Sequence, residues 1–159
     1  MRYLKHSYKS GDKIIPKDTA SKIELVLENC QRSLKKRSAT LIRKDILEAL
    51  RKIGWSNKVR ISAKRGLTLT AKQGKTALCL QTGNMARFYA DLLKLQAQFL
   101  DEKITSAIYV LPTRDAARVM GENIANYERL AAELKNTFSK VITVPLLIYG
   151  FYAESKGGS

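Results

Sequence analysis

The sequence contains few of the side chains that most catalytic and metal-binding sites require. It has one histidine, His6, and two cysteines, Cys30 and Cys79, among 159 residues. A lone histidine argues against a zinc site and against a histidine general base. Two cysteines indicate free thiols and a reducing compartment, because small secreted domains that depend on disulfides are rich in cysteine.

Long apolar runs are also missing. None approaches the ~20 residues of a membrane-spanning helix, and the first nine residues, MRYLKHSYK, contain no apolar segment of the kind a secretory signal has. No internal repeat or low-complexity segment is apparent. We therefore expect a cytoplasmic protein with no membrane partner, folded as a single domain over residues 1–159.

Acidic side chains are scarce, and their scarcity is uneven. The chain has 29 Lys and Arg against 14 Asp and Glu, a formal net charge of +15. Residues 1–75 hold 20 basic and 6 acidic side chains, whereas residues 76–159 hold 9 and 8, and no acid lies between Glu48 and Asp91. Such one-sided basic charge favours a nucleic-acid partner, because neutralised phosphates release counterions. The alternative is a generally basic protein, such as a ribosome-associated domain.

Hydrophobic periodicity divides the chain into a helical, basic part (1–56), a sheet core (57–151) and a flexible polar tail (152–159). Residues 1–8 are expected to be irregular or an edge strand. Helices are predicted at 16–30 and 41–54. Three strands with short glycine turns follow as an antiparallel meander, at 57–63, 67–71 and 77–81. The remainder alternates helices and strands, at 84–100, 106–111, 114–120, 123–138 and 141–149, with Pro145 suggesting an edge position or a bulge in the last strand. This order predicts parallel crossovers and an α/β sandwich around a central mixed sheet.

The stretch from Thr76 to Leu100 organises this pattern. A short apolar strand bounded by Gly74 and Gly83 leads into Q-T-G-N and then into a helix that Asn84 can cap. Apolar side chains at helical spacing predict its buried stripe: Met85, Phe88, Tyr89, Leu92, Leu93, Phe99 and Leu100. Functional groups tend to lie at such a junction of strand, turn and helix.

This order of motifs resembles the BglII/BstYI type of restriction endonuclease and, more distantly, BamHI. The matching elements are the strand with Q-T-G-N, the helix A-R-F-Y-A-D-L-L-K-L-Q, the strand I-Y-V-L-P, and V-P-L-L-I-Y-G, within residues 66–151. The resemblance implies the restriction-endonuclease-like PD-(D/E)XK fold, an α/β sandwich with a central mixed sheet flanked by helices. It further implies a double-stranded DNA partner and homodimers.

The catalytic positions implied by the resemblance are only partly retained. The family's Glu-x-Gln falls on residues 79–81, so Gln81 matches but Cys79 stands where the Glu is expected, and Thr70 stands where the Asp is expected. Mg²⁺ requires hard oxygen ligands, usually including carboxylates, whereas a thiol is a soft ligand. We therefore expect no cofactor and no metal ligands, with Mg²⁺ implied only if the chain is catalytically active.

Basic residues in loops are the predicted DNA contacts. One group lies between the first two predicted helices, and a second lies in the turns of the meander. The predicted set, with two residues of the junction, is Arg32, Lys35, Lys36, Arg37, Lys64, Arg65, Lys72, Lys75, Asn84 and Arg87. For any one of them, a solvated surface charge is the competing interpretation.

Two functional hypotheses follow. The first is a DNA-binding protein on a restriction-endonuclease-like scaffold that has lost metal-dependent cleavage. The second is an active metal-dependent endonuclease whose carboxylates come from a partner subunit or from Glu24, Glu28, Glu48 or Asp91. Loss of both expected acids favours the first hypothesis. An RNA-binding or protein-inhibitory role is a third, weaker alternative.

Overall fold

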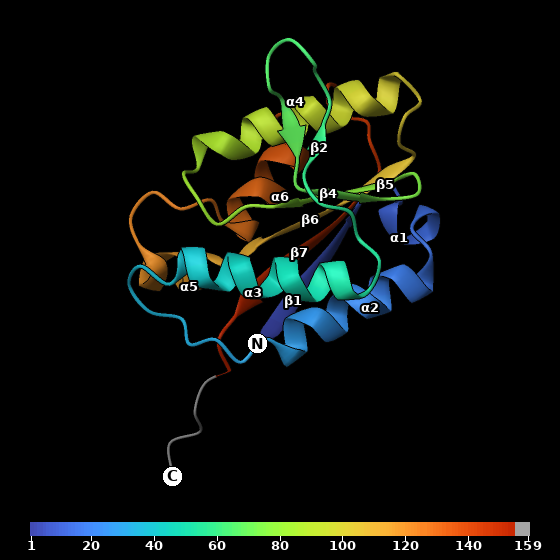
Figure 1. Ribbon diagram of the computed structural model, residues 1–159. Helices are drawn as coiled ribbons and strands as arrows, with labels where there is room; N and C mark the ends of the chain where they lie inside the picture. The colour runs from blue at the N-terminus through green and yellow to red at the C-terminus, as the bar shows by residue number, and fades with distance from the viewer. Residues whose placement is uncertain (155–159) are drawn as a thin grey trace.

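The computed structural model describes residues 1–154, which form a central sheet between two layers of helices (Figure 1). The five-stranded sheet has the order β1-β7-β6-β5-β4. Its strands are β1 (Arg2–Tyr8), β4 (Ala71–Gln73), β5 (Thr76–Leu80), β6 (Ser106–Pro112) and β7 (Leu146–Tyr152). β5, β6 and β7 are parallel, whereas β1 and β4 are antiparallel edge strands. The predicted mixed sheet is thus present, and β1 is an edge strand.

Helices cover both faces of the sheet because alternate strand residues point to opposite sides. Leu78, Leu80 and Val110 face the layer of α2 (Lys17–Asn29) and α3 (Ala39–Lys52). Cys79 and Tyr109 face the opposite layer of α4 (Ala86–Leu100) and α6 (Tyr127–Asn136). α1 (Gly11–Ile14) and α5 (Arg114–Met120) are short connecting helices. No helix within residues 1–154 is long and apolar enough to cross a membrane.

The predicted strand at 67–71 is interrupted at Thr70. β3 (Thr68–Leu69) pairs with β2 (Val59–Arg60) in a separate two-stranded sheet, and β4 pairs with β5. The continuous antiparallel meander predicted from the sequence is therefore wrong. The physical reason is a side-chain contact: the Thr70 side chain, not a backbone carbonyl, accepts the hydrogen bond of the Leu80 amide (3.1 Å). The chain can turn at this point because the amide remains satisfied.

Other boundaries also differ from the predictions. Pro145 precedes β7, which lies inside the sheet between β1 and β6, so neither the edge position nor the bulge is present. Only the backbone carbonyl of Pro145 is needed there, as the acceptor for Ala107 N (2.9 Å). The short helix α1 was not predicted. A Cβ on Gly11 would lie 2.1 Å from the carbonyl oxygen of Leu146, so only glycine allows α1 to approach β7 this closely.

The α4 helix is rotated relative to its predicted stripe. Leu93 and Leu100 are 63% and 68% exposed, while Asp91 and Leu95 are buried. Asp91 can occupy the inward stripe because hydrogen-bond donors surround its carboxylate, as described below. The predicted tail at 152–159 overlaps the end of β7, and its last five residues, 155–159, lie outside the described residues.

Candidate nucleic-acid interface

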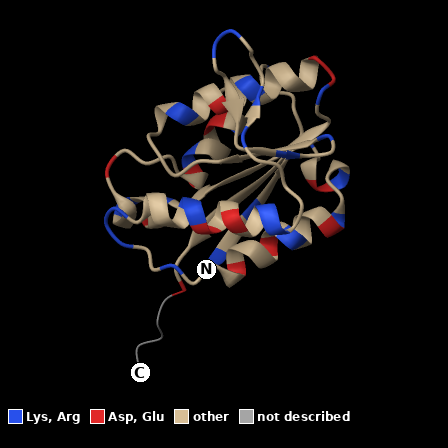
Figure 2. Cartoon of the chain, in the orientation of Figure 1, with Lys and Arg blue, Asp and Glu red and all other residues tan. Residues whose placement is uncertain are grey.

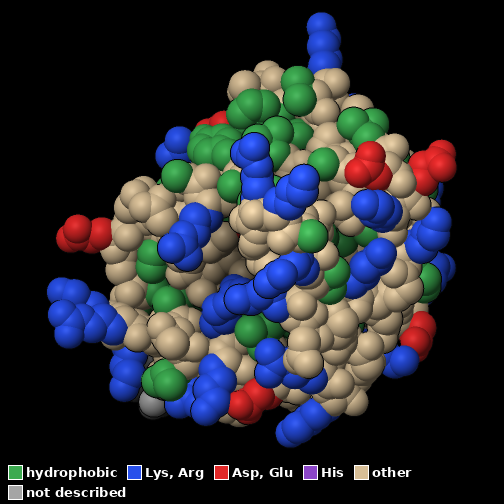
Figure 3. Space-filling view, turned by 45° about the horizontal axis from the view of Figure 1, so that its top comes forward, with side chains coloured by type: hydrophobic (Ala, Val, Ile, Leu, Met, Phe, Trp, Pro, Cys, Tyr) green, Lys and Arg blue, Asp and Glu red, His purple; other side chains and the backbone are tan. Residues whose placement is uncertain are grey.

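A cavity of about 510 Å³ opens at the carboxyl end of β5, between α3 and α4. α3 contributes Arg43 and Arg51, and α4 contributes Arg87, Asp91 and Lys94. Lys58, Thr68, Thr70 and residues 80–83 supply the remaining polar wall. Figure 3 shows a hollow on this face with Lys and Arg side chains gathered around it. We call this cavity the cationic cleft, after its five cations: Arg43, Arg51, Lys58, Arg87 and Lys94.

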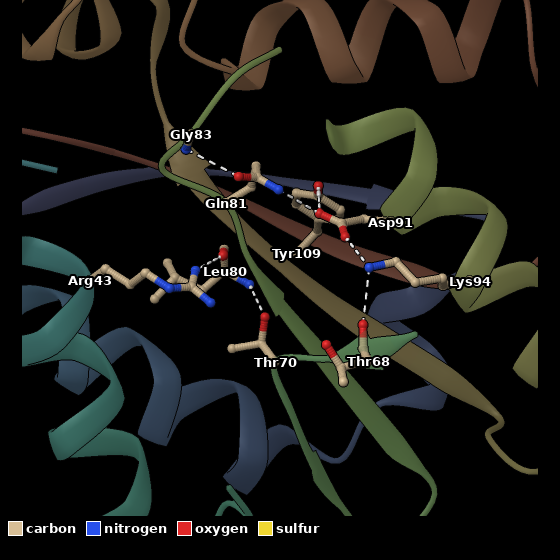
Figure 4. A network of polar contacts seen from close by, with 9 residues as sticks. All are labelled: Arg43, Thr68, Thr70, Leu80, Gln81, Gly83, Asp91, Lys94 and Tyr109. Atoms are coloured by element: carbon tan, nitrogen blue, oxygen red, sulfur yellow. Dashed lines mark hydrogen bonds and ion pairs between the residues drawn. The ribbon is translucent and has the colours of Figure 1, made fainter. Parts of the chain in front are cut away.

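The floor of the cleft is formed by the backbone of Leu80. The β4–β5 ladder ends at Leu78, so the edge-side backbone groups of Leu80 have no strand partner. The Thr70 hydroxyl accepts from the Leu80 amide at 3.1 Å, and the Arg43 guanidinium donates to the Leu80 carbonyl (Figure 4). Two side chains thus replace the missing strand at this end of the sheet.

Asp91 is held by three donors on the other side of β5. Its Oδ2 accepts from Gln81 Nε2 and from Tyr109 Oη, both at 2.8 Å (Figure 4). Its Oδ1 lies 2.9 Å from Lys94 Nζ, which also donates to the Thr68 carbonyl at 3.0 Å. Burial, followed by the charge of Asp91, raises the pKa of Tyr109 well above its usual value, so the phenol stays protonated and donates. The carboxylate is therefore buried, held by three donors and paired with a cation.

Both polar groups of the Gln81 side chain make hydrogen bonds within the protein. While Nε2 donates to Asp91, its Oε1 accepts from the Gly83 amide at 3.0 Å. Cys79, two residues before it, is only 1% exposed and faces the α4 layer. Burial raises the pKa of the Cys79 thiol above its usual value, and the charge of Asp91 adds to this effect. The thiol is therefore neutral and is a poor metal ligand.

The residues of the cleft do not fit a magnesium site. Mg²⁺ needs hard oxygen ligands that are free to coordinate it, yet Thr70, Gln81 and Asp91 already use their oxygens in protein hydrogen bonds. Within residues 1–154, no three His, Cys, Asp or Glu side chains are grouped so as to hold a metal ion. Five cations against one carboxylate also disfavour a divalent cation electrostatically.

The structure brings together only part of the predicted site. Thr70, Gln81 and Arg87 line the cleft. Asn84 comes directly after Gly83, a residue of the cleft wall, and its Oδ1 accepts from the Ala86 amide at 2.8 Å. α4 begins at Ala86, two residues after the predicted cap. Cys79 lies beneath the cleft, not in its wall.

The predicted loop cations lie outside the cleft wall. Lys64 and Arg65 are in the loop between β2 and β3, and residues 35–37 lie between α2 and α3. Arg32 donates to both carboxylate oxygens of Asp45, at 2.7 and 3.0 Å. Lys72 and Lys75, near the β4–β5 turn, donate to the carbonyls of residues 103 and 102, at 2.8 and 3.0 Å.

Of the four acids considered as substitute metal ligands, only Asp91 lies in the cleft. Glu24 is 2.7 Å from Lys5 Nζ and accepts from Tyr149 Oη at 3.0 Å, in the α2 layer. Glu48 is exposed and lies 3.9 Å from Lys44 Nζ. Glu28 lines a different depression beside the N-terminus. None of these three glutamates can act in the cleft as the protein is folded.

Sequence reasoning missed Arg43, Arg51, Lys58 and Lys94 as cleft residues. Arg43, Leu47 and Arg51 are spaced at i, i+4 and i+8, which places them in one row along α3. That spacing was a usable signal for a shared face. Which neighbour the row faces depends on how α3 and α4 flank the end of β5, and the helix pattern alone does not contain that information.

Comparison with known proteins identifies a similar family and similar folds. The model of the restriction endonuclease BglII/BglIII family matches residues 3–151. The crystal structure of restriction endonuclease BglII complexed with a DNA 16-mer superposes with a TM-score of 0.83 at 15% identity, covering 97% of this chain and 79% of that one. Free BglII superposes with a TM-score of 0.71 at 16% identity, covering 97% and 81%. No curated protein sequence matches. The fold predicted from the sequence is confirmed.

Proposed function

This chain belongs to the restriction endonuclease BglII/BglIII family, and we propose that it binds double-stranded DNA in the cationic cleft without cleaving it through a metal ion. The observation that carries the proposal is the charge of the cleft: five cations surround one carboxylate, which Lys94 already neutralises. A phosphodiester backbone would satisfy these cations and release its counterions. The match to the fold of a BglII–DNA complex supports duplex DNA as the nucleic acid.

The absence of suitable acids supports binding without cleavage. Metal-assisted hydrolysis needs an anchored ion that activates water or stabilises the leaving oxygen. Thr70 and Cys79 cannot supply negative charge, because one is a hydroxyl engaged with Leu80 and the other is a buried neutral thiol. Asp91 is the one remaining acid of the cleft, and three protein donors hold it.

The DNA contacts are proposed in two groups. The five cleft cations, Arg87 among them, would hold the backbone nearest the end of β5, and Asn84 would contact it just beyond the cleft wall. The loop cations would contact flanking phosphates: Arg32, Lys35, Lys36, Arg37, Lys64, Arg65, Lys72 and Lys75. The homodimer implied by the resemblance stays a prediction, which sedimentation equilibrium would test.

The second candidate is an active endonuclease that uses Asp91. The specific observation in its favour is that Asp91 lies beside Gln81, the retained catalytic position, although it projects from α4 and not from β5. In this case, the Lys94 ion pair would have to open for a metal ion to bind. Cleavage that disappears in an Asp91→Asn variant would establish this candidate.

One experiment separates the two candidates. The protein is incubated with supercoiled plasmid and Mg²⁺ or Mn²⁺, and a parallel mobility-shift assay uses duplex DNA and an RNA of the same sequence. We expect retarded duplex DNA and intact plasmid with either ion. Nicked or linear plasmid would contradict the proposal, and retardation of RNA alone would replace DNA with RNA as the partner.

The matched control is a variant with Lys22→Gln, Lys44→Gln and Arg118→Gln. These three cations lie outside the cleft and are each within 4.0 Å of an acid. The variant has the same net charge as a cleft variant in which three cleft cations, Arg43, Arg51 and Lys58, are replaced by Gln. It should keep nearly all of the DNA affinity, so that a loss seen only in the cleft variant is assigned to the cleft.

A further inference from the structure

Arg43 is a half-buried cation without an acidic partner. Within residues 1–154, ion pairs engage many basic side chains, but none includes Arg43. One of its N–H groups donates to the Leu80 carbonyl, which fixes the side chain across the floor of the cleft (Figure 4). A guanidinium has five N–H donors in a rigid fork. Most of these donors therefore remain available toward the cavity.

The surroundings of Arg43 are unfavourable for a lone cation. Burial lowers the pKa of the Arg43 guanidinium from its usual value, while the charge of Asp91 acts in the opposite direction. An arginine side chain still stays protonated near neutral pH. A bound anion would compensate the desolvated positive charge more directly than Asp91, which makes its contacts with Gln81, Tyr109 and Lys94 and none with Arg43.

A second guanidinium faces the same space from the other helix layer. Arg87 extends from the first turn of α4, and its positive charge is among the influences that lower the pKa of Arg43. Its Nη1 lies beside Gly83, where an added Cβ would be 3.5 Å away. Within residues 1–154, Arg87 likewise belongs to no ion pair. Two unpaired cations thus converge from α3 and α4 on the end of β5.

We propose that Arg43 and Arg87 form a phosphate subsite that grips one phosphodiester group at the position where the family pattern expects metal-binding acids. Thr70 and Gln81, which mark that position, hold the backbone on either side of the subsite. Planar guanidinium forks suit phosphate oxygens because they bind them in a bidentate manner. The protein's own cations would then perform the charge neutralisation for which a nuclease needs a divalent ion. That the phosphate belongs to DNA rests on the proposed function.

Inorganic phosphate is the first probe, because it tests the subsite without DNA. Side-chain Nε–Hε signals of ¹⁵N-labelled protein are followed by NMR as phosphate replaces chloride at constant ionic strength. An Arg43→Lys variant assigns the Arg43 signal. We expect saturable shifts of the Arg43 and Arg87 signals that are larger than those of Arg32, which is already paired with Asp45.

DNA affinity is the second measurement. Arg43→Gln should lower the affinity for a short duplex about tenfold at 0.15 M salt and reduce the slope of log K against log salt by about 1. Arg43→Lys, which keeps the charge but not the fork, should fall between wild type and Arg43→Gln. Lys44→Gln is the matched control, because it removes the same charge from the next position of α3, where Lys44 pairs with Glu48.

The possible outcomes are distinct. If wild type binds DNA but phosphate moves neither arginine signal, the subsite is wrong and the proposed function stands. If wild type fails to bind DNA yet phosphate gives saturable shifts, the subsite stands and the proposed function falls. Equal affinity losses in Arg43→Gln and Lys44→Gln would also overturn the subsite. Should Arg43→Gln fail to fold, the phosphate titration of wild type and the Arg43→Lys variant still decide.

Discussion

α3 carries cations on two sides, and one of those on the outer side, Lys44, has an acidic neighbour of the kind that the cleft-side cations lack within residues 1–154. On the outer side, Lys44 lies near Glu48, and Asp45 receives a two-point hydrogen bond from Arg32. On the cleft side, within residues 1–154, neither Arg43 nor Arg51 belongs to an ion pair. Figure 2 shows blue and red side by side along this helix, whereas the charged side chains around the hollow in Figure 3 are mainly blue.

A cation paired with a neighbouring acid is partly neutralised, whereas an unpaired cation is available to a partner. Exposed pairs contribute little to stability and leave no net field. Unpaired cations around a cavity produce a positive potential, which a polyanion can lower. The net charge of +15 indicated a polyanion partner, and the cleft is a cavity lined by several cations that have no acidic partner within residues 1–154.

The largest effect is expected when the cleft side is made neutral. Arg43→Gln, Arg51→Gln and Lys58→Gln together should lower DNA affinity about 10³-fold at low salt and reduce the salt slope by roughly 3, because three phosphate contacts are lost. Fluorescence anisotropy at several salt concentrations measures both values. If the control variant, with Lys22, Lys44 and Arg118 replaced by Gln, loses as much DNA affinity, the cleft cations are not the specific DNA contacts.

Adding acids to the cleft should reduce the excess of positive charge that distinguishes it from the outer side of α3. Thr70→Asp with Cys79→Glu should lower the free energy of unfolding by about 3 kcal/mol, because position 79 is buried. The same variant should bind Mn²⁺ more tightly than wild type, since it restores two carboxylates beside Gln81. Chemical unfolding and calorimetry test the two parts. Unchanged Mn²⁺ affinity would count against the alignment of Thr70 and Cys79 with the family's acids.

Removing the one acid of the cleft should increase the excess of positive charge that distinguishes the cleft from the outer side of α3. Asp91→Asn leaves Gln81, Tyr109 and Lys94 without their charged acceptor, so unfolding free energy should fall by about 2 kcal/mol. DNA affinity should rise a few-fold, because a negative charge near the phosphates has gone. Urea unfolding and anisotropy measure these changes. A fall in DNA affinity by a protein that remains folded would be the contrary result.

A paired cation should have the smallest effect. Arg32→Gln removes a predicted DNA contact, but Arg32 is engaged by Asp45, so the affinity should change less than about threefold. Arg51→Gln, tested beside it, should cost more. If Arg32 proves the more important of the two, then pairing in the free protein does not indicate which cations reach DNA.

Much of the fold could be predicted because it depends on local patterns. The apolar runs at 77–81 and 106–111 predicted the buried strands β5 and β6, and Gly54, with φ of 96°, follows the C-cap of α3 at the end of the helix predicted at 41–54. The break at Thr70 was not predictable, because it depends on one side-chain hydrogen bond to Leu80, ten residues along the chain.

The candidate site was predictable only in part. The resemblance to the family pattern predicted that Gln81 is retained and that Thr70 and Cys79 stand in place of two acids, and this stays a prediction. Asp91 was considered as a substitute acid, but its burial and three donors appear only when α4 packs against β5 and β6. Arg43 was not among the predicted DNA contacts, because an apolar stripe shows which residues face the core but not which border a cleft.

We propose that protein cations hold a phosphate group in this cleft, at the position where the nuclease pattern would hold a divalent ion. Crystals soaked in Mn²⁺ and measured for anomalous scattering test it most directly. If protein cations hold the phosphate group, no manganese peak should appear within coordination distance of Thr70, Gln81 or Asp91, at about 2–2.5 Å. A well-occupied manganese ion bound there by protein oxygens would contradict it.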